Sequence, residues 1–200
     1  MMTDTDKIQL YHFERCPFCE KARRGFRALG LSYDSQIIDP GDRSRVEQIS
    51  GQPSVPVIVD GDTTLPESTD IVTYLDKNYG NGSPLVPESP EERGRVYMLD
   101  RYADEVWGPL GYKAIVKVDS DGNDLDKDGQ ENLQQRINKE AGFLDDALQS
   151  GDYLVGDSLT LADLAVSAFI SRMVNYSDFQ PTDSYTHLWA WYDRIDTHLN

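Results

Sequence analysis

Residues 7–29 read KIQLYHFERCPFCEKARRGFRAL, and this stretch decides how the chain begins to fold. Residues 7–13 are rich in aromatic and aliphatic side chains, which predicts a strand. Pro17 then suits the first turn of a helix, where its missing N–H costs nothing. The helix is expected to run from Cys16 to Leu29, with Gly30 as its C-terminal cap. A strand is therefore predicted to lead directly into a helix that opens on Cys-Pro-Phe-Cys.

Both cysteines of the chain, Cys16 and Cys19, lie in this motif. Two cysteines do not complete a four-ligand zinc site, so no metal site is expected, and a disulfide between them would close too short a loop to stabilise the fold. A sulfur at the N-cap meets free N–H groups and the positive end of the helix, which favour the thiolate. Cys16 is therefore the candidate nucleophile and Cys19 the candidate resolving thiol. Five basic residues are expected to favour the thiolate further: Arg15, Lys21, Arg23, Arg24 and Arg27.

The rest of the first eighty residues alternates between strand and helix signals. Strands are expected at 31–39, 55–59 and 63–65, a helix at 67–79, and a short helix or turn at 43–49. This order predicts a small α/β domain with a mixed sheet over residues 1–80.

The composition changes after this domain. Residues 81–90 contain three prolines and a Gly-Ser pair, which is typical of a linker. Residues 91–200 are expected to form an all-α domain, with helices at 91–110, 131–148, 160–174 and 184–199. The segment 160–174 is apolar nearly all round, so it is predicted to be the buried centre of that domain.

Two further segments carry chemical signals. Pro56 lies just inside a predicted buried strand and removes a ladder donor, a conflict that a cis Val55–Pro56 bond would resolve. The backbone of Val55 would then be free to pair with an extended peptide ligand. Ser68 and the N–H groups that open the 67–79 helix form a candidate site for a carboxylate. Glu67 or Asp70 is placed to accept an ammonium group.

Charge and composition exclude several function classes. The 200 residues carry a net charge of −16, which argues against a simple nucleic-acid binder and against an anionic membrane surface as partner. No apolar run approaches the roughly 20 residues that span a bilayer, and Met1 to Asp6 lacks a signal-peptide pattern. A cytoplasmic protein is expected. The excess of aspartate fits either a salt-rich cytoplasm or an ordinary acidic protein.

The segment 119–129 is rich in aspartate. Residues 124–129 match the first half of an EF-hand calcium loop, but its twelfth position is Gln135 rather than a bidentate glutamate. A solvated acidic loop is therefore favoured over a calcium site.

Cys-Pro-Phe-Cys at 16–19, Val-Pro at 55–56 and Glu-Ser at 67–68, ahead of an all-helical half, together resemble the cytosolic glutathione transferase superfamily. The resemblance covers essentially the full chain. It implies a thioredoxin-like N-terminal domain followed by the family's helical domain. Thr160 and Asp163 are similar to the family's capping box, and Leu159 and Leu164 to its hydrophobic staple.

The resemblance also implies glutathione, or a related thiol such as γ-glutamylcysteine, as cosubstrate. The γ-glutamyl end would lie on Glu67 and Ser68, and the cysteinyl backbone on Val55 ahead of Pro56. Many members use a tyrosine or serine where this chain has Cys16, and that departure favours glutaredoxin-like chemistry. Glutathione-dependent thiol–disulfide exchange is therefore predicted, with a disulfide as second substrate.

Two alternatives stay open: conjugation of glutathione to an electrophile, and a non-catalytic binding protein with this fold. Tyr11 is an alternative thiolate donor, although a buried strand aromatic is the favoured interpretation, and the histidines are interpreted as structural. The family is mostly dimeric, so a homodimer and a monomer both remain open. Four aromatic residues are expected either to line a second-substrate pocket or to pack helices: Tyr97, Tyr102, Trp107 and Tyr112.

Overall fold

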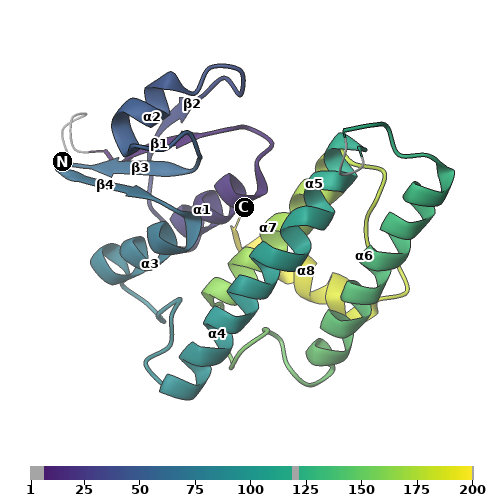
Figure 1. The fold of residues 1–200 in the computed structure, drawn as a ribbon. Coiled ribbons are helices and arrows are strands. Elements are labelled where there is room, and N and C mark those ends of the chain that lie inside the picture. Colours follow the sequence, from purple (N-terminus) through teal and green to yellow (C-terminus); the bar gives the residue numbers. More distant parts are fainter. Residues whose placement is uncertain (1–6, 119–121, 200) are drawn as a thin grey trace.

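The computed structural model describes residues 7–118 and 122–199, and its N-terminal part is built on a four-stranded sheet (Figure 1). The strand order is β2-β1-β3-β4; β1 and β2 are parallel, whereas β3 is antiparallel to both β1 and β4. The strands are β1 (Gln9–His12), β2 (Asp34–Ile37), β3 (Val57–Asp60) and β4 (Thr63–Pro66). The helices are α1 (Pro17–Ala28), α2 (Ser44–Ser50) and α3 (Ser68–Tyr79). The predicted mixed sheet is confirmed.

The sheet separates two layers of helices, because successive strand residues point to opposite faces. Leu10 packs with Phe26 of α1 and Ile71 of α3 on one face. Its neighbour Tyr11 packs with Val46 of α2 on the other face. This alternation places α1 between the sheet and the helical part of the molecule, as Figure 1 shows.

The C-terminal part is helical throughout the ranges that the structure assigns to elements. Its helices are α4 (Pro90–Tyr102), η1 (Ala103–Trp107), α5 (Gly108–Val116), α6 (Lys127–Ala147), η2 (Leu148–Ser150), α7 (Leu161–Tyr176) and α8 (Thr186–Leu199). The core forms around α7, which is buried over most of its length and contacts α1, α4 and α5. None of the described helices is long and apolar enough to cross a membrane. The glutathione transferase fold predicted from the sequence is thus present, while the exact domain limits stay a prediction.

The predicted helix 91–110 is longer and less regular than expected. It continues to Val116 and contains one π-helical turn, η1, in which the Gly108 N–H bonds to the Ala103 carbonyl. Pro109 follows directly and has no N–H to donate to the preceding turn, so a wider turn at this point accommodates it.

The helix predicted at 131–148 begins earlier, at Lys127. The Asp126 carboxylate accepts a 2.8 Å hydrogen bond from the Gly129 N–H and so caps α6. Residues 127–129 are therefore helical and do not form part of a calcium loop. No group of three potential metal ligands occurs among the described residues, and residues 119–121 lie outside them.

The start of α7 follows the predicted capping box. The Asp163 carboxylate accepts from the Thr160 N–H at 2.9 Å, and its second oxygen accepts from Leu154 N–H and Trp191 Nε1, each at 2.9 Å. Burial raises the pKa of Asp163 despite these bonds. Asp163 therefore completes the capping box of α7 and also connects α7 to α8 through Trp191.

Candidate functional site

Cys16 occupies the N-cap of α1, with Pro17 as the first helical residue. Its sulfur accepts a 3.4 Å hydrogen bond from the Cys19 N–H. A hydrogen bond from the Cys19 thiol is the largest influence on Cys16, and with the N–H groups of Cys19 and Phe18 it outweighs burial. Together they lower the pKa of Cys16 to about 7. A substantial fraction of the half-buried sulfur, about half, is thus ionised at neutral pH.

Cys19 has the opposite environment. Its side chain is fully buried, and burial together with the neighbouring Cys16 sulfur raises its pKa well above the ordinary value for a thiol. The two cysteines therefore form an unequal pair, in which one sulfur is available as a thiolate and the other keeps its proton.

The five cations expected to favour the Cys16 thiolate are engaged with other partners in the structure. Lys21 is held by Asp100, with Nζ 2.6 Å from the carboxylate, and Arg15 stacks over the ring of Tyr176. Arg23, Arg24 and Arg27 all form ion pairs with Glu20. Arg23 still contributes to the lowered pKa of Cys16, but it ranks behind the hydrogen bonds. Hydrogen bonds, above all that from the Cys19 thiol, therefore outweigh nearby charge at this sulfur.

A cavity of about 190 Å³ brings together four residues that the sequence singled out. Val55, Pro56, Glu67 and Ser68 line it, and the Val55–Pro56 bond is cis, as expected. Phe18 and Ser54 also line the cavity and were missed. Their residue types do not mark Phe18 and Ser54 as site residues. The sequence offers only their positions next to Cys19 and Val55, which were selected for their chemistry.

Glu67 and Ser68 lie at the N-terminus of α3. Glu67 adopts φ 70°, a left-handed conformation that is uncommon for a glutamate and often found at functional positions. Gln52 Nε2 donates to its carboxylate at 3.4 Å. Ser68 is the first residue of α3 and is buried, so its backbone N–H belongs to the anion-attracting helix start. Asp70, in the same first turn, is exposed and does not line the cavity.

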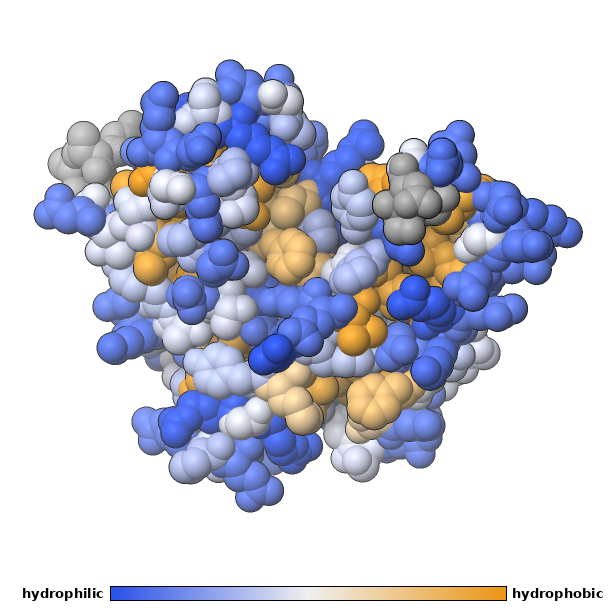
Figure 2. All heavy atoms as spheres, viewed as in Figure 1, coloured by the Kyte–Doolittle hydropathy of each residue, from blue (hydrophilic) through white to orange (hydrophobic). Residues whose placement is uncertain are grey.

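Phe18 joins this cavity to the helical domain. Its ring meets Phe169 of α7 edge to face, with centroids 5.2 Å apart, and a Cβ added at Gly108 would lie 3.4 Å from it. Figure 2 shows apolar surface in the hollow between the two parts of the molecule.

The four aromatic residues predicted at this position do not share one environment. Trp107 is completely buried in the helical core, so of the two expected roles it has that of helix packing. The Tyr102 hydroxyl donates to Glu140 at 2.6 Å, whereas Tyr97 and Tyr112 are exposed. A pocket role for these three tyrosines stays a prediction.

Tyr11 is a buried strand residue, as favoured from the sequence. Its hydroxyl donates to Gln9 at 2.6 Å, and its ring faces α2 rather than the start of α1. His12 is buried beside it in the chain and contacts Arg23 and Ser35. Neither side chain is placed as a thiolate partner for the cavity.

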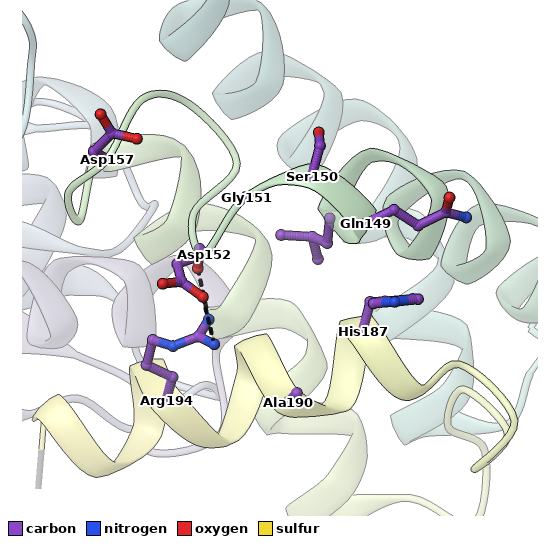
Figure 3. A pocket seen from close by; sticks show the side chains of 9 residues that line it. Gln149, Ser150, Gly151, Asp152, Asp157, His187, Ala190 and Arg194 are labelled. Atoms are coloured by element: carbon purple, nitrogen blue, oxygen red, sulfur yellow. Dashed lines mark hydrogen bonds and ion pairs between the residues drawn. The ribbon is translucent and has the colours of Figure 1, made fainter.

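The widest depression described lies elsewhere, between η2 and α8 (Figure 3). It has a volume of about 490 Å³, and Arg194 spans it to pair with Asp152 at 2.8 Å. It contains no residue of the sheet domain, whereas the cavity beside Phe18 is lined by that domain alone; Cys16 and Cys19 are among the lining residues of neither. Cavity size therefore does not identify the site in this chain.

Comparisons with known proteins agree with this architecture. Residues 10–84 match the family model for the glutathione S-transferase N-terminal domain, and residues 100–198 match the C-terminal domain model. Glutathione S-transferase D7 of Drosophila melanogaster is 31 % identical over 175 residues, covering 85 % of this chain and 76 % of that protein. Glutathione S-transferase F10 of Arabidopsis thaliana is 29 % identical over 177 residues, covering 84 % and 82 %. A delta-class glutathione transferase of Nilaparvata lugens superposes with a TM-score of 0.78 at 26 % identity, covering 95 % of this chain and 88 % of that one.

Proposed function

Because this chain belongs to the glutathione S-transferase family, we propose that it is a thiol transferase that uses glutathione to exchange disulfides, with Cys16 as nucleophile and Cys19 as resolving thiol. The observation that carries this proposal is the opposite ionisation of the two sulfurs. The pKa of Cys16 is lowered to about 7, whereas that of Cys19 is raised. Such a pair supplies one thiolate as the nucleophile and one protonated thiol that can later resolve the mixed disulfide.

Glutathione is proposed to bind in the cavity beside Phe18. The N–H groups at the start of α3, together with Ser68, suit the carboxylate of its γ-glutamyl end, and Glu67 suits the ammonium. The Val55 backbone lies just before β3 begins at Val57 and lines the cavity, which supports pairing with the cysteinyl part of an extended tripeptide.

The reaction begins when the Cys16 thiolate attacks the glutathione sulfur of a mixed disulfide. A bond forms between Cys16 and glutathione, the original disulfide breaks, and the released thiolate takes a proton from water. A second glutathione thiolate then attacks the Cys16-bound sulfur, which releases oxidised glutathione and restores the Cys16 thiolate. Alternatively, Cys19 loses its proton and attacks Cys16, which releases glutathione and leaves a Cys16–Cys19 disulfide. Two further glutathione molecules reduce that disulfide.

Conjugation of glutathione to an electrophile is the second candidate, and the names of the relatives favour it. In that reaction the cosubstrate's sulfur attacks the electrophile, and Cys16 is at most a hydrogen-bonding partner. The two candidates therefore differ in whether Cys16 becomes covalently modified.

A paired assay distinguishes them. A glutathionylated peptide and a chlorinated nitroaromatic compound are offered separately to the wild type, Cys16→Ser and Cys19→Ser. We expect disulfide exchange to vanish in Cys16→Ser and to persist in part in Cys19→Ser, because glutathione can replace the resolving thiol. Robust conjugation that survives Cys16→Ser, with little exchange in the wild type, would overturn the proposal. If neither activity nor glutathione binding is found, the chain is a binding protein with this fold.

The ionisation itself is measurable without a substrate. Alkylation of Cys16 by iodoacetamide should rise with pH and reach half its maximal rate near pH 7, because the thiolate is the reacting form and the pKa is about 7. Cys19→Ala removes the thiol that donates to Cys16 and should shift this midpoint upward. A midpoint near the ordinary cysteine value in the wild type would contradict the proposed nucleophile.

A further inference from the structure

A dense cluster of guanidinium groups lies along another side of α1. Glu20 is only 2 % exposed, yet its carboxylate meets four of them: Arg23 at 2.8 Å, Arg27 at 3.0 Å, Arg172 at 3.2 Å and Arg24 at 3.4 Å. Arg172 comes from α7, so the cluster joins the two domains. One carboxylate thus pairs with four cations, although the chain as a whole carries a net charge of −16.

A cavity of about 240 Å³ adjoins this cluster. Its wall contains three of the arginines, Arg23, Arg27 and Arg172, together with Glu20, His12, Glu14 and Tyr176. None of these residues lines the cavity formed by Phe18 and Ser68. The two cavities are therefore separate sites that share α1.

The charge of this wall is not balanced by the carboxylates that face it. Arg24 is also paired with Asp196, at 2.8 Å. Glu20 therefore compensates mainly the charges of the other three arginines, Arg23, Arg27 and Arg172. Glu14 also lines the cavity, but it is exposed, so solvent screens its carboxylate; its backbone carbonyl accepts from Arg23 at 3.1 Å and from Arg172 at 3.4 Å. Arg15 adds a further cation, 5.3 Å from the centre of the Tyr176 ring. Uncompensated charge at a buried position is costly, and a bound anion would relieve that cost.

Some donors of the arginines are also unused. Arg172 Nε is buried and has no hydrogen-bond partner among the described residues. Its Nη atoms lie 3.2 Å from the Glu20 carboxylate and form two long hydrogen bonds of 3.4 Å, to the Glu14 carbonyl and the Ser171 hydroxyl. The Arg27 side chain is 35 % exposed and, within residues 7–118 and 122–199, donates to Glu20 through Nη1 alone.

His12 holds Arg23 in place without adding charge. An arginine only donates, so His12 Nδ1 accepts from Arg23 Nη1 at 2.9 Å, and the ring proton on Nε2 is donated to the Ser35 hydroxyl at 2.8 Å. Burial and the adjacent Arg23 lower the pKa of His12, which keeps the ring neutral at pH 7. The guanidinium groups therefore supply the positive charge of the wall.

We propose that this cavity binds a phosphate group, either inorganic phosphate or a phosphomonoester. Three guanidinium groups approach from two helices, and each presents a planar fork of donors. A tetrahedral dianion has enough oxygens to accept from all three at once, whereas a planar carboxylate has two. The site does not depend on the thiol chemistry proposed above.

Arg23 links the phosphate site to Cys16, since it lines the cavity and also helps to stabilise the Cys16 thiolate. A phosphate dianion beside Arg23 offsets that positive charge. Bound phosphate is therefore expected to raise the alkylation midpoint of Cys16 slightly and to slow its reaction below pH 7.

Calorimetric titration of the full chain with inorganic phosphate, at constant ionic strength set with chloride, tests the site. We expect Arg27→Gln to weaken phosphate binding by about tenfold or more, because it removes a charge-assisted hydrogen bond. Arg172→Gln should act in the same direction. Arg194→Gln, which removes one positive charge from the depression in Figure 3, should bind phosphate as the wild type does.

Further arms of the titration separate the ligand sources. Phenyl phosphate that binds at least as well as inorganic phosphate identifies a phosphomonoester site, and weaker binding identifies a site for the free ion. Acetate or added chloride that competes equally well, or wild-type binding that matches Arg27→Gln and Arg172→Gln, would overturn the proposal. Cys16→Ser should bind phosphate normally, so a failure of the thiol proposal and a failure of this one are distinguishable.

Discussion

Two adjacent residues of α1, Glu20 and Lys21, are buried in opposite electrostatic surroundings. Glu20 is one carboxylate among four guanidinium groups. Lys21 is one ammonium group, fully buried, held by Asp100 at 2.6 Å and by Asp104 and Thr69 at 3.1 and 2.8 Å. Since successive helix residues point about 100° apart, one helix presents a cation-rich cluster on one side and an acid-rich cluster on another.

The comparison shows how the two domains are joined. Glu20 reaches Arg172 of α7, whereas Lys21 reaches Asp100 of α4 and Asp104 of η1. Each cluster has one central charge and an excess of the opposite sign around it. Removing the centre therefore leaves like charges buried together, which costs more than removing one charge from the periphery.

The largest effect is expected from Glu20→Gln. The substitution keeps the shape of the side chain but leaves four guanidinium groups around a neutral amide, so we expect the free energy of unfolding to fall by about 3–5 kcal/mol. Urea unfolding measures this loss. A loss close to zero would mean that solvent, rather than Glu20, compensates the arginines.

Lys21→Met should destabilise the chain by a smaller amount, about 2–4 kcal/mol. The methionine fills the buried volume, and Asp104, whose side chain is 28 % exposed, can take up a proton or turn to water. The same urea experiment gives the comparison. A larger loss for Lys21→Met than for Glu20→Gln would reverse the proposed order of the two clusters.

The pH dependence of stability should also differ between the clusters. Burial tends to raise the pKa of Glu20, but Arg172, Arg23 and Arg27 outweigh it and lower the pKa below 4.5. The stability that Glu20 supplies is therefore complete above pH 4.5 and is lost as the pH falls toward its folded-state value.

The pKa of Asp104 is shifted in the opposite direction to that of Glu20, so its effect on stability changes with pH in the opposite sense. Burial raises its pKa above 3.8 although Lys21 opposes the shift, so its ionised form costs stability at neutral pH. That cost shrinks as the pH falls through its folded-state pKa toward 3.8. Asp104→Asn should thus be at least as stable as the wild type at pH 7, with the difference disappearing near pH 4. Thermal unfolding at both values tests this, and a marked loss at pH 7 would show that the Lys21 pair dominates.

The smallest effect is expected from Arg101→Gln. Its partner Glu105 lies 2.7 Å away, but the side chains are 77 % and 60 % exposed, so the pair should contribute about 0.5 kcal/mol or less. Urea unfolding in low and high salt provides the control for the two buried clusters. A loss comparable to that of Lys21→Met would show that burial does not set the ranking.

Local pattern predicted most of the fold because the signals were local. The strand before Cys16, the helix start at Pro17 and the capping box at Thr160 each specify backbone geometry within a few residues. The prediction was weaker at two helix irregularities, although their causes, Pro109 and the Asp126 cap, are also local in the sequence. The π-helical turn before Pro109 and the early start of α6 at Lys127 were both missed.

The candidate site divides in the same way. The N-cap position of Cys16 followed from the order of residues around Pro17. The surroundings of the basic residues did not, because Lys21 and Arg24 find their carboxylates at Asp100 and Asp196, far along the chain. Of these basic residues, Arg23 is the one among the main causes of the lowered pKa of Cys16.

The amino-acid sequence by itself determined the family, the order of strands and helices, and the position of a cysteine at the N-terminus of the first helix. These features depend on interactions between residues that are close in the sequence. Only the tertiary structure decided which charges meet. It buried Glu20 among arginines and Lys21 among aspartates because the partners come from helices that approach α1 from different directions. Pairings of this kind depend on long-range packing, which the spacing of residues along the chain does not encode.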